Sequence, residues 1–141
     1  MKFNKLIPEL SVSDFKKSLH FYTKILGFSI EYTREERKFA FLSFQGSQLM
    51  IENMRSANKQ FITGKIEYPF GRGINIQIQV KSVMQIIKKI KKHKYPIWHD
   101  LCVNWYRKDN RLLGNKEFLI KDPDGYLLRI FEDIGSKTLK K

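Results

Sequence analysis

The sequence predicts an α+β fold made of two βαβββ modules, and three observations support this prediction. In residues 73–80, branched apolar side chains alternate with amide side chains, which is typical of a strand with one buried face. Residues 15–26 and 83–90 carry apolar side chains at helical spacing, with lysines between them. Laid over one another so that Leu10 falls on Ile78, the two halves share this pattern, which indicates an internal duplication.

The length of 141 residues suits one domain with a core of its own, so we expect a single domain over residues 1–141. The one cysteine, Cys102, cannot form a disulfide within the chain. The start of the chain lacks the apolar run of a signal peptide, and no stretch approaches the roughly 18 apolar residues of a membrane span. These features predict a cytoplasmic protein without a membrane partner.

The net charge of +13 raises the question of a polyanionic partner. Lysines are spread along the whole chain, and their densest cluster, residues 88–94, lies on the expected solvent side of a helix. No motif of a nucleic-acid-binding fold accompanies the charge. Nucleic-acid binding is therefore kept only as an alternative that the pattern does not favour.

The first module is expected over about residues 1–64. Residues 6–12 alternate as a strand, and Pro8 places that strand at an edge because proline cannot donate to a ladder. Ser13 or Asp14 can cap the helix that follows, and Gly27 can end it. Three further strands are predicted at residues 28–33, 39–44 and 48–53.

The second module is expected over about residues 71–135, after a linker at 54–72 with at most a short helix. The strand at 73–80 precedes a helix that Ser82 can cap. Further strands are predicted at residues 97–102, 117–121 and 126–132, with a turn at 122–125. The stretch 104–114, rich in charged and polar residues, is expected to be a loop.

Three motifs in order resemble the vicinal oxygen chelate superfamily, also called the glyoxalase/bleomycin resistance/dioxygenase superfamily. The residues that carry the resemblance are 12–22 with 26–28, then 71–75, then 122–129. The resemblance implies paired βαβββ modules whose curved mixed sheets enclose a cavity. It also implies a homodimer, in which the N-terminal strand is often exchanged between subunits.

Enzymes of this superfamily hold a divalent metal with four inward side chains drawn from His, Glu and Gln. The resemblance places these positions at Ile7, Met50, Asn75 and Arg129. Ile7 has no donor atom and Met50 offers only a soft thioether, while Asn75 is a weak neutral ligand and Arg129 brings a positive charge. The resemblance therefore implies no metal, no cofactor and no metal-dependent catalysis at these positions.

A displaced metal site remains an alternative. Strand alternation turns Glu9 and Glu52 toward the same cavity, where they could hold a metal in a lyase, transferase or dioxygenase. Two neighbouring carboxylates are more often a polar wall or partners in salt bridges.

The branch that the chain resembles most is that of the bleomycin resistance proteins, which bind the drug without changing it. The resemblance implies a groove at the dimer interface, in which aromatic side chains stack on a planar aromatic or glycopeptide ligand. Trp105 and Tyr106 stand out because they interrupt a polar stretch, whereas Phe39 and Phe41 are better explained by core packing than by stacking on a ligand. The candidate ligand-binding residues are Tyr32, Phe39, Phe41, Met50, Glu52, Asn75, Gln77, Trp98, Trp105, Tyr106 and Arg129.

The charge of the chain argues against bleomycin as the ligand. Bleomycin is cationic, and a chain of +13 would repel it at long range. A neutral or anionic aromatic ligand fits this charge better.

Overall fold

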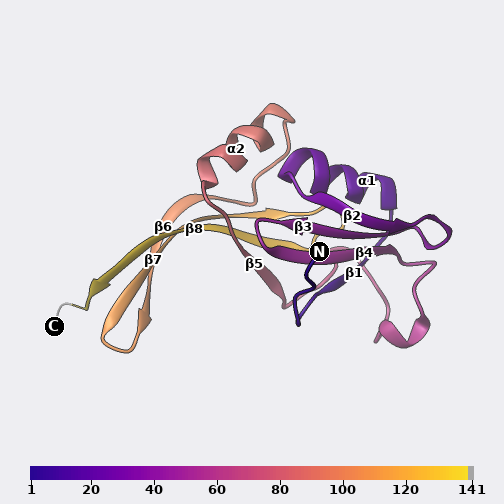
Figure 1. Cartoon of the computed structure of the whole chain (residues 1–141), viewed down its shortest axis with the longest axis horizontal. Coiled ribbons are helices and arrows are strands. Elements are labelled where there is room, and N and C mark those ends of the chain that lie inside the picture. The colour runs from indigo at the N-terminus through magenta and orange to yellow at the C-terminus, as the bar shows by residue number, and fades with distance from the viewer. Residues whose placement is uncertain (140–141) are drawn as a thin grey trace. The chain divides into compact units, whose positions relative to one another are not determined.

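The computed structural model describes residues 1–139 and divides them into two compact units (Figure 1). Unit 1 contains Met1–Arg72 and the turn Asp122–Tyr126, and unit 2 contains Gly73–Lys121 and the chain from Leu127 onward. Each unit holds a four-stranded mixed sheet, with strand order β1-β4-β3-β2 in unit 1 and β5-β8-β7-β6 in unit 2. The first strand of each sheet runs parallel to the last strand of its unit, and the other pairs are antiparallel. The predicted α+β fold with two βαβββ modules is confirmed.

Unit 1 is a sheet with one helical segment packed on one of its two faces. Its strands are β1 (Glu9–Val12), β2 (Ser29–Arg34), β3 (Phe39–Phe44) and β4 (Ser47–Asn53). The helical segment consists of α1 (Phe15–His20) and a π-helical continuation η1 (Phe21–Leu26), and short 3-10 turns lie at η2 (Glu35–Arg37) and η3 (Lys59–Phe61).

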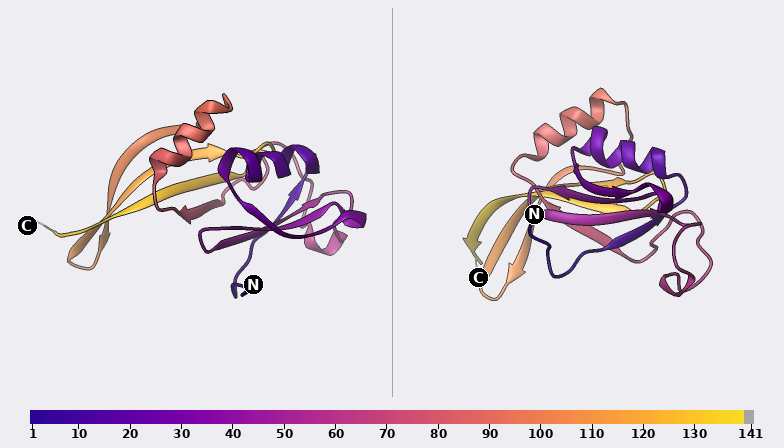
Figure 2. Two further views of the ribbon diagram at one scale, coloured as in Figure 1. Left: turned by 45° about the horizontal axis from the view of Figure 1, so that its top comes forward. Right: turned by 45° about the vertical axis from the view of Figure 1, so that its right-hand side comes forward.

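The predicted caps of the first helix are in place. The Asp14 side chain accepts a hydrogen bond from the Lys17 backbone N–H, and Gly27 ends η1 with a φ of 107°, a conformation that favours glycine. Figure 2 shows α1 along one face of the sheet. The core of unit 1 consists of buried residues of the continuation η1 and alternate residues of β1, β3 and β4, namely Leu10, Val12, Phe21, Tyr22, Ile25, Leu26, Ala40, Leu42, Leu49 and Ile51.

Unit 2 repeats this plan with longer strands. Its elements are β5 (Asn75–Gln79), α2 (Val83–Lys92), β6 (His99–Lys108), β7 (Arg111–Lys121) and β8 (Leu127–Thr138). The Ser82 side chain caps α2, as predicted. Its core joins α2 to one face of the sheet through Ile78, Val80, Val83, Ile86, Ile87, Ile90, Phe118, Ile120, Leu128 and Ile130.

Two predictions about unit 2 are wrong. The branched apolar side chains of residues 73–80 were expected to form one buried face, but the first of them, Ile74, precedes β5 and is exposed. The stretch 104–114 was expected to be a loop, but β6 and β7 continue through it as a hairpin closed at residues 109–110. Because β5 pairs only with Leu127–Phe131 of β8, the rest of β6, β7 and β8 forms a three-stranded arm that extends beyond β5 (Figure 1).

Candidate functional site

The face of the unit 2 sheet that α2 leaves uncovered holds a groove of about 450 Å³. Strand alternation places the amides of β5 on this face, beside alternate residues of β8 and β7. The groove is lined by Gln77, Gln79, Tyr106, Leu113, Asn115, Arg129, Phe131 and Asp133. A volume of this size suits a small organic molecule.

A buried carboxylate, Glu117, organises one end of this groove. Its Oε1 accepts hydrogen bonds from the Tyr106 hydroxyl and, at 2.8 Å, from the Asn104 amide. Its Oε2 lies 3.4 Å from Nη2 of Arg129. The Arg129 guanidinium also donates to the Tyr106 hydroxyl at 3.2 Å and to Oδ1 of Asn75 at 3.4 Å. Four strands thus contribute to one polar network.

The electrostatics of this network follow from its hydrogen bonds. Burial by itself raises the pKa of Glu117, but the hydrogen bonds from Tyr106 and Asn104 and the charge of Arg129 outweigh burial and bring the pKa below its usual value. The hydrogen bond to Glu117, with burial, raises the pKa of Tyr106. Glu117 is therefore ionised and Tyr106 is a neutral hydroxyl donor at neutral pH.

The uncovered face of the unit 1 sheet carries an aromatic cluster instead. The Tyr32 ring stacks on Phe41 at 5.2 Å between centroids and lies 5.9 Å from Phe39. Phe3, from the segment before β1, packs edge-on against Phe41, and the Arg34 guanidinium lies 4.6 Å from the centre of the Phe39 ring. Phe39 is 3% and Phe41 1% exposed, so the chain itself covers these two candidate ligand-binding rings and they act as packing residues.

Two carboxyl groups lie together on the same face of unit 1. Glu52 is 4% exposed, and its Oε1 lies 2.7 Å from Nε of Arg37, which also donates to the Ser56 carbonyl. Burial, followed by a hydrogen bond with Glu52 and repulsion from it, raises the pKa of Glu9, and this outweighs the charges of Arg34 and Arg37. The pair forms an ion-paired polar wall, in which Glu9 holds a proton more readily than an exposed glutamate.

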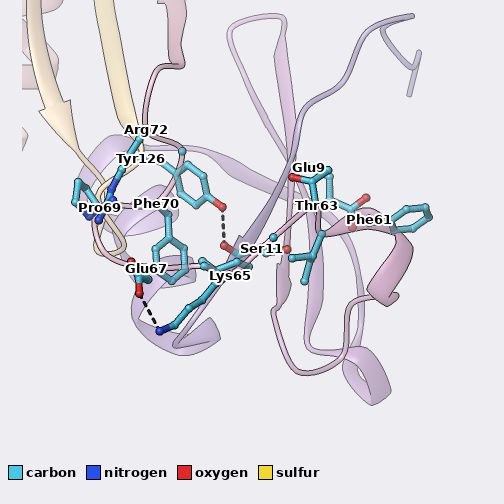
Figure 3. Close-up of a pocket in the computed structure, with 14 residues that line it drawn as sticks. Glu9, Ser11, Phe61, Thr63, Lys65, Glu67, Pro69, Phe70, Arg72 and Tyr126 are labelled. Carbon is cyan, nitrogen blue, oxygen red and sulfur yellow. Dashed lines mark hydrogen bonds and ion pairs between the residues drawn. The ribbon is translucent and has the colours of Figure 1, made fainter.

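Unit 1 has a pocket as well, which lies between β1 and the segment 61–72 and has a volume of about 420 Å³ (Figure 3). The Tyr126 hydroxyl donates to the Ser11 carbonyl at 2.9 Å and so joins the turn before β8 to β1. Lys65 and Glu67 form an exposed ion pair at 3.0 Å on the loop side. Glu9 also lines this pocket, so the carboxyl pair borders on it.

The comparisons with known proteins agree with this architecture. The model of the Glyoxalase/Bleomycin resistance protein/Dioxygenase superfamily matches residues 6–130. The chain belongs to the glyoxalase/bleomycin resistance/dioxygenase superfamily. Among proteins with curated descriptions, none matches this chain in sequence.

Three solved structures illustrate the likeness. A virulence protein from Salmonella typhimurium is 19% identical with a TM-score of 0.66, and the match covers 94% of this chain and 98% of that one. A glyoxalase/bleomycin resistance protein/dioxygenase from Alicyclobacillus acidocaldarius is 19% identical with a TM-score of 0.62, covering 93% and 92%. A superfamily member from Vibrio splendidus 12B01 is 28% identical over 89% and 95%, with a TM-score of 0.41. We base the likeness of fold on the first two.

The strand registers show that Met50 in unit 1 and Arg129 in unit 2 occupy equivalent positions, each opposite a residue of the first strand of its unit. Glu9 pairs with Met50 in unit 1, and Gln77 pairs with Arg129 in unit 2. Neither Met50 nor Arg129 suits a divalent cation, and Arg129 already donates to Asn75, the neighbouring candidate position. The residues do not fit the superfamily's metal centre, and we assign no step through a metal to them.

The structure also gives little support to the alternative metal site at Glu9 and Glu52. Among residues 1–139, no group of three or more His, Cys, Asp or Glu side chains is arranged to hold a metal ion. Glu9 and Glu52 are neighbours, as alternation predicted, but Glu52 is paired with Arg37.

The structure brings some of the candidate ligand residues together and separates others. Asn75, Gln77, Tyr106 and Arg129 meet on the uncovered face of unit 2. Trp105 lies against Gly114 and Ile134 on the opposite face of the arm, under Lys137. Trp98 is 60% exposed, packs with Lys121 and does not line the groove.

Sequence reasoning missed several residues of the site. Asn104 lies on β6, and it meets Glu117 of β7 because these two strands pair. Leu113 belonged to the expected loop, and Asn115 lay between that loop and the strand predicted at 117–121. The alternation of Arg129, Phe131 and Asp133 along β8 was the one available signal, and it extends beyond the predicted end of that strand at residue 132.

No helix among residues 1–139 is long and apolar enough to cross a membrane.

Proposed function

We propose that this chain binds a small organic ligand without chemical change, in the manner that the name of the bleomycin resistance proteins suggests. The observation that carries the proposal is the groove of unit 2, in which a fixed polar network lies beside amide and apolar side chains. The side chains at the superfamily's metal positions support a binding role over a metal-dependent reaction.

The ligand is proposed to be planar and aromatic, or a glycopeptide with such a part. Tyr106 and Phe131 offer aromatic surface along the groove, and the amides of Gln77, Gln79 and Asn115 offer hydrogen bonds. The net charge of +13 favours a neutral or anionic ligand over cationic bleomycin.

We also propose that the chain acts as a homodimer in which a second copy covers the arm. Val103, Trp105 and Ile134 are exposed apolar side chains of the arm, and β6 is the end strand of its sheet. Tyr106 and Leu113 are also exposed side chains of the arm, on the face that carries the groove, so a partner that extends over this second face would help to close the groove.

A thermal-shift screen of the full chain tests the binding role. Bleomycin, planar aromatic amides and carboxylates, and divalent metals are compared as probes. A ligand that binds only the folded state stabilises it by about 2.7 kcal/mol at 100 times its Kd, which raises Tm by several degrees. We expect a rise with planar aromatics and a smaller rise in Gln77→Ala, with Gln85→Ala on the exposed side of α2 as the matched control.

The outcomes separate the rival functions. No shift with any organic probe overturns the binding proposal. A shift with bleomycin supports the resistance role itself. Stoichiometric Fe, Mn, Ni or Zn in protein purified without chelator overturns the non-catalytic role in favour of a metal-dependent enzyme that uses Glu9 and Glu52.

A further inference from the structure

The Arg129 guanidinium lies in the groove with part of its hydrogen-bonding capacity unused. Its side chain is 26% exposed, and it lines the groove. Its contacts with Tyr106, Asn75 and Glu117 measure 3.2, 3.4 and 3.4 Å. Charge-assisted hydrogen bonds between arginine and a carboxylate are usually about 2.7–2.9 Å long. The three contacts orient the guanidinium without saturating its five N–H donors.

Glu117 holds Arg129 in place but does not form a bidentate pair with it. Its Oε1 is occupied by Tyr106 and Asn104, and only Oε2 faces the guanidinium, at 3.4 Å. Glu117 is also buried, whereas Arg129 reaches the groove surface. Nε and the second hydrogen of Nη1 carry none of these hydrogen bonds, so a carboxylate in the groove can accept a charge-assisted hydrogen bond from the guanidinium.

The rest of the groove defines what the carboxylate is attached to. Phe131 follows Arg129 on the same face of β8, and Leu113 lies on β7, so the middle of the groove has an apolar surface. The amides of Gln77, Gln79 and Asn115 line the groove as well and can bind a polar edge of the ligand. Asp133 lies four residues beyond Arg129 on β8, about 13 Å away along an extended strand, and it disfavours a second negative charge at that end.

We propose that the groove of unit 2 binds aromatic monocarboxylates, with Arg129 as the residue that holds the carboxylate. This inference rests on the proposed binding function and narrows it to one class of ligand. The planar body lies over Phe131 and Leu113, and the carboxylate meets the guanidinium that Glu117 and Tyr106 orient.

The experiment measures the affinity of the full chain for pairs of probes that differ only in charge. Benzoate, 2-naphthoate and indole-3-acetate are each compared with the corresponding primary amide by isothermal titration calorimetry. We expect the carboxylates to bind roughly tenfold or more tightly than their amides, because a hydrogen bond from arginine to a carboxylate is charge-assisted. Arg129→Gln is expected to abolish this preference, and Arg129→Lys to keep only part of it, since lysine retains the charge but not the fixed directions of the guanidinium N–H groups.

Arg111→Gln is the matched control. It removes the same charge from an exposed arginine of the arm that does not line the groove, and it is expected to leave the preference unchanged. Circular dichroism and Tm verify that each variant is folded, and Arg129→Lys serves as the test if Arg129→Gln does not fold.

Each result decides between the inference and its alternatives. Equal affinity for carboxylates and amides overturns the inference but leaves the proposed binding function intact. A preference that survives in Arg129→Gln, or falls equally in Arg111→Gln, assigns the effect to the overall positive charge and overturns the inference. Failure of all six probes overturns the inference, and the proposed function then stands or falls on the other organic probes of the thermal-shift screen.

Discussion

Asp122 is the carboxyl group whose ionisation is most affected by the fold. Its Oδ1 accepts the backbone N–H groups of Asp124 and Tyr126 at 2.9 Å, and its Oδ2 accepts the Tyr22 hydroxyl at 2.8 Å. These bonds form the predicted turn at 122–125 and attach it to η1. Burial nevertheless raises the pKa of Asp122 from 3.8 to about 6, because the hydrogen bonds offset only part of the cost of burying the charge.

This raised pKa makes the stability of unit 1 depend on pH. The folded chain binds the Asp122 proton more tightly than the unfolded chain, so the contribution is fully present below about pH 4 and is lost as pH rises through about 6. Asp122→Asn keeps the size of the side chain but cannot titrate. We expect the unfolding free energy of the natural chain, relative to Asp122→Asn, to fall by up to about 3 kcal/mol from about pH 4 to about pH 7.

Urea denaturation of both proteins across this range measures the difference. Asp109→Asn, at the exposed tip of the β6–β7 hairpin, makes the same chemical change outside the turn and is the control. A difference for Asp122→Asn that stays constant from pH 4 to pH 7 would contradict the raised pKa.

At the residue scale, the sequence identified side chains that lie on a strand face but not those that meet through pairing. Alternation placed Asn75 and Gln77 on the uncovered face, and the structure agrees. The contact between Glu117 and Arg129 depends on how β7 pairs with β8, which the pattern of neither strand shows by itself. Alternation also put Phe41 on the correct face without revealing that Phe3 and Tyr32 cover it.

The arm is the element that sequence patterns described least well. Strands were predicted only at 97–102 and 117–121, because the charged residues between them mimic a loop. In a hairpin that extends beyond its sheet both faces meet solvent, so the alternation of polar and apolar residues that marks a half-buried strand is lost. Gly114, at the expected end of the loop, is instead a position of close packing: a Cβ there would lie 2.7 Å from carbons of both Trp105 and Ile134.

This packing makes Gly114→Ala a test of the arm. The added methyl group must displace the Trp105 ring or the Ile134 side chain, and we expect a loss of about 1–2 kcal/mol in the free energy of unfolding. The tryptophan fluorescence spectrum should change as well, because the Trp105 ring moves relative to Lys137.

Gly64→Ala provides the control, because nothing lies within 4 Å of a Cβ at that position. If 104–114 were a loop after all, Gly114→Ala would leave both stability and fluorescence unchanged.

At the scale of the whole molecule, the internal duplication was readable because core periodicity survives where sequence identity does not. The equivalence of Met50 and Arg129 by motif appears again in the strand registers, where each lies opposite the corresponding residue of a first strand. What a second subunit covers could not be read in this way, since an exposed strand edge and a paired one have the same sequence pattern. The oligomeric state therefore has to be measured.

The exposed apolar residues of the arm predict how the homodimer can be disrupted. Val103 lies on the end strand β6, and a glutamate there would place a charge in the proposed interface. We expect the natural chain to sediment at twice its mass of 16.8 kDa, and Val103→Glu to raise the Kd of the dimer by roughly tenfold or more. Met84→Glu, which changes an equally exposed apolar residue of α2, should leave the dimer intact. Sedimentation velocity over a range of concentrations measures all three proteins. A natural chain that stays monomeric throughout, or variants that dissociate equally, would contradict an interface on the arm.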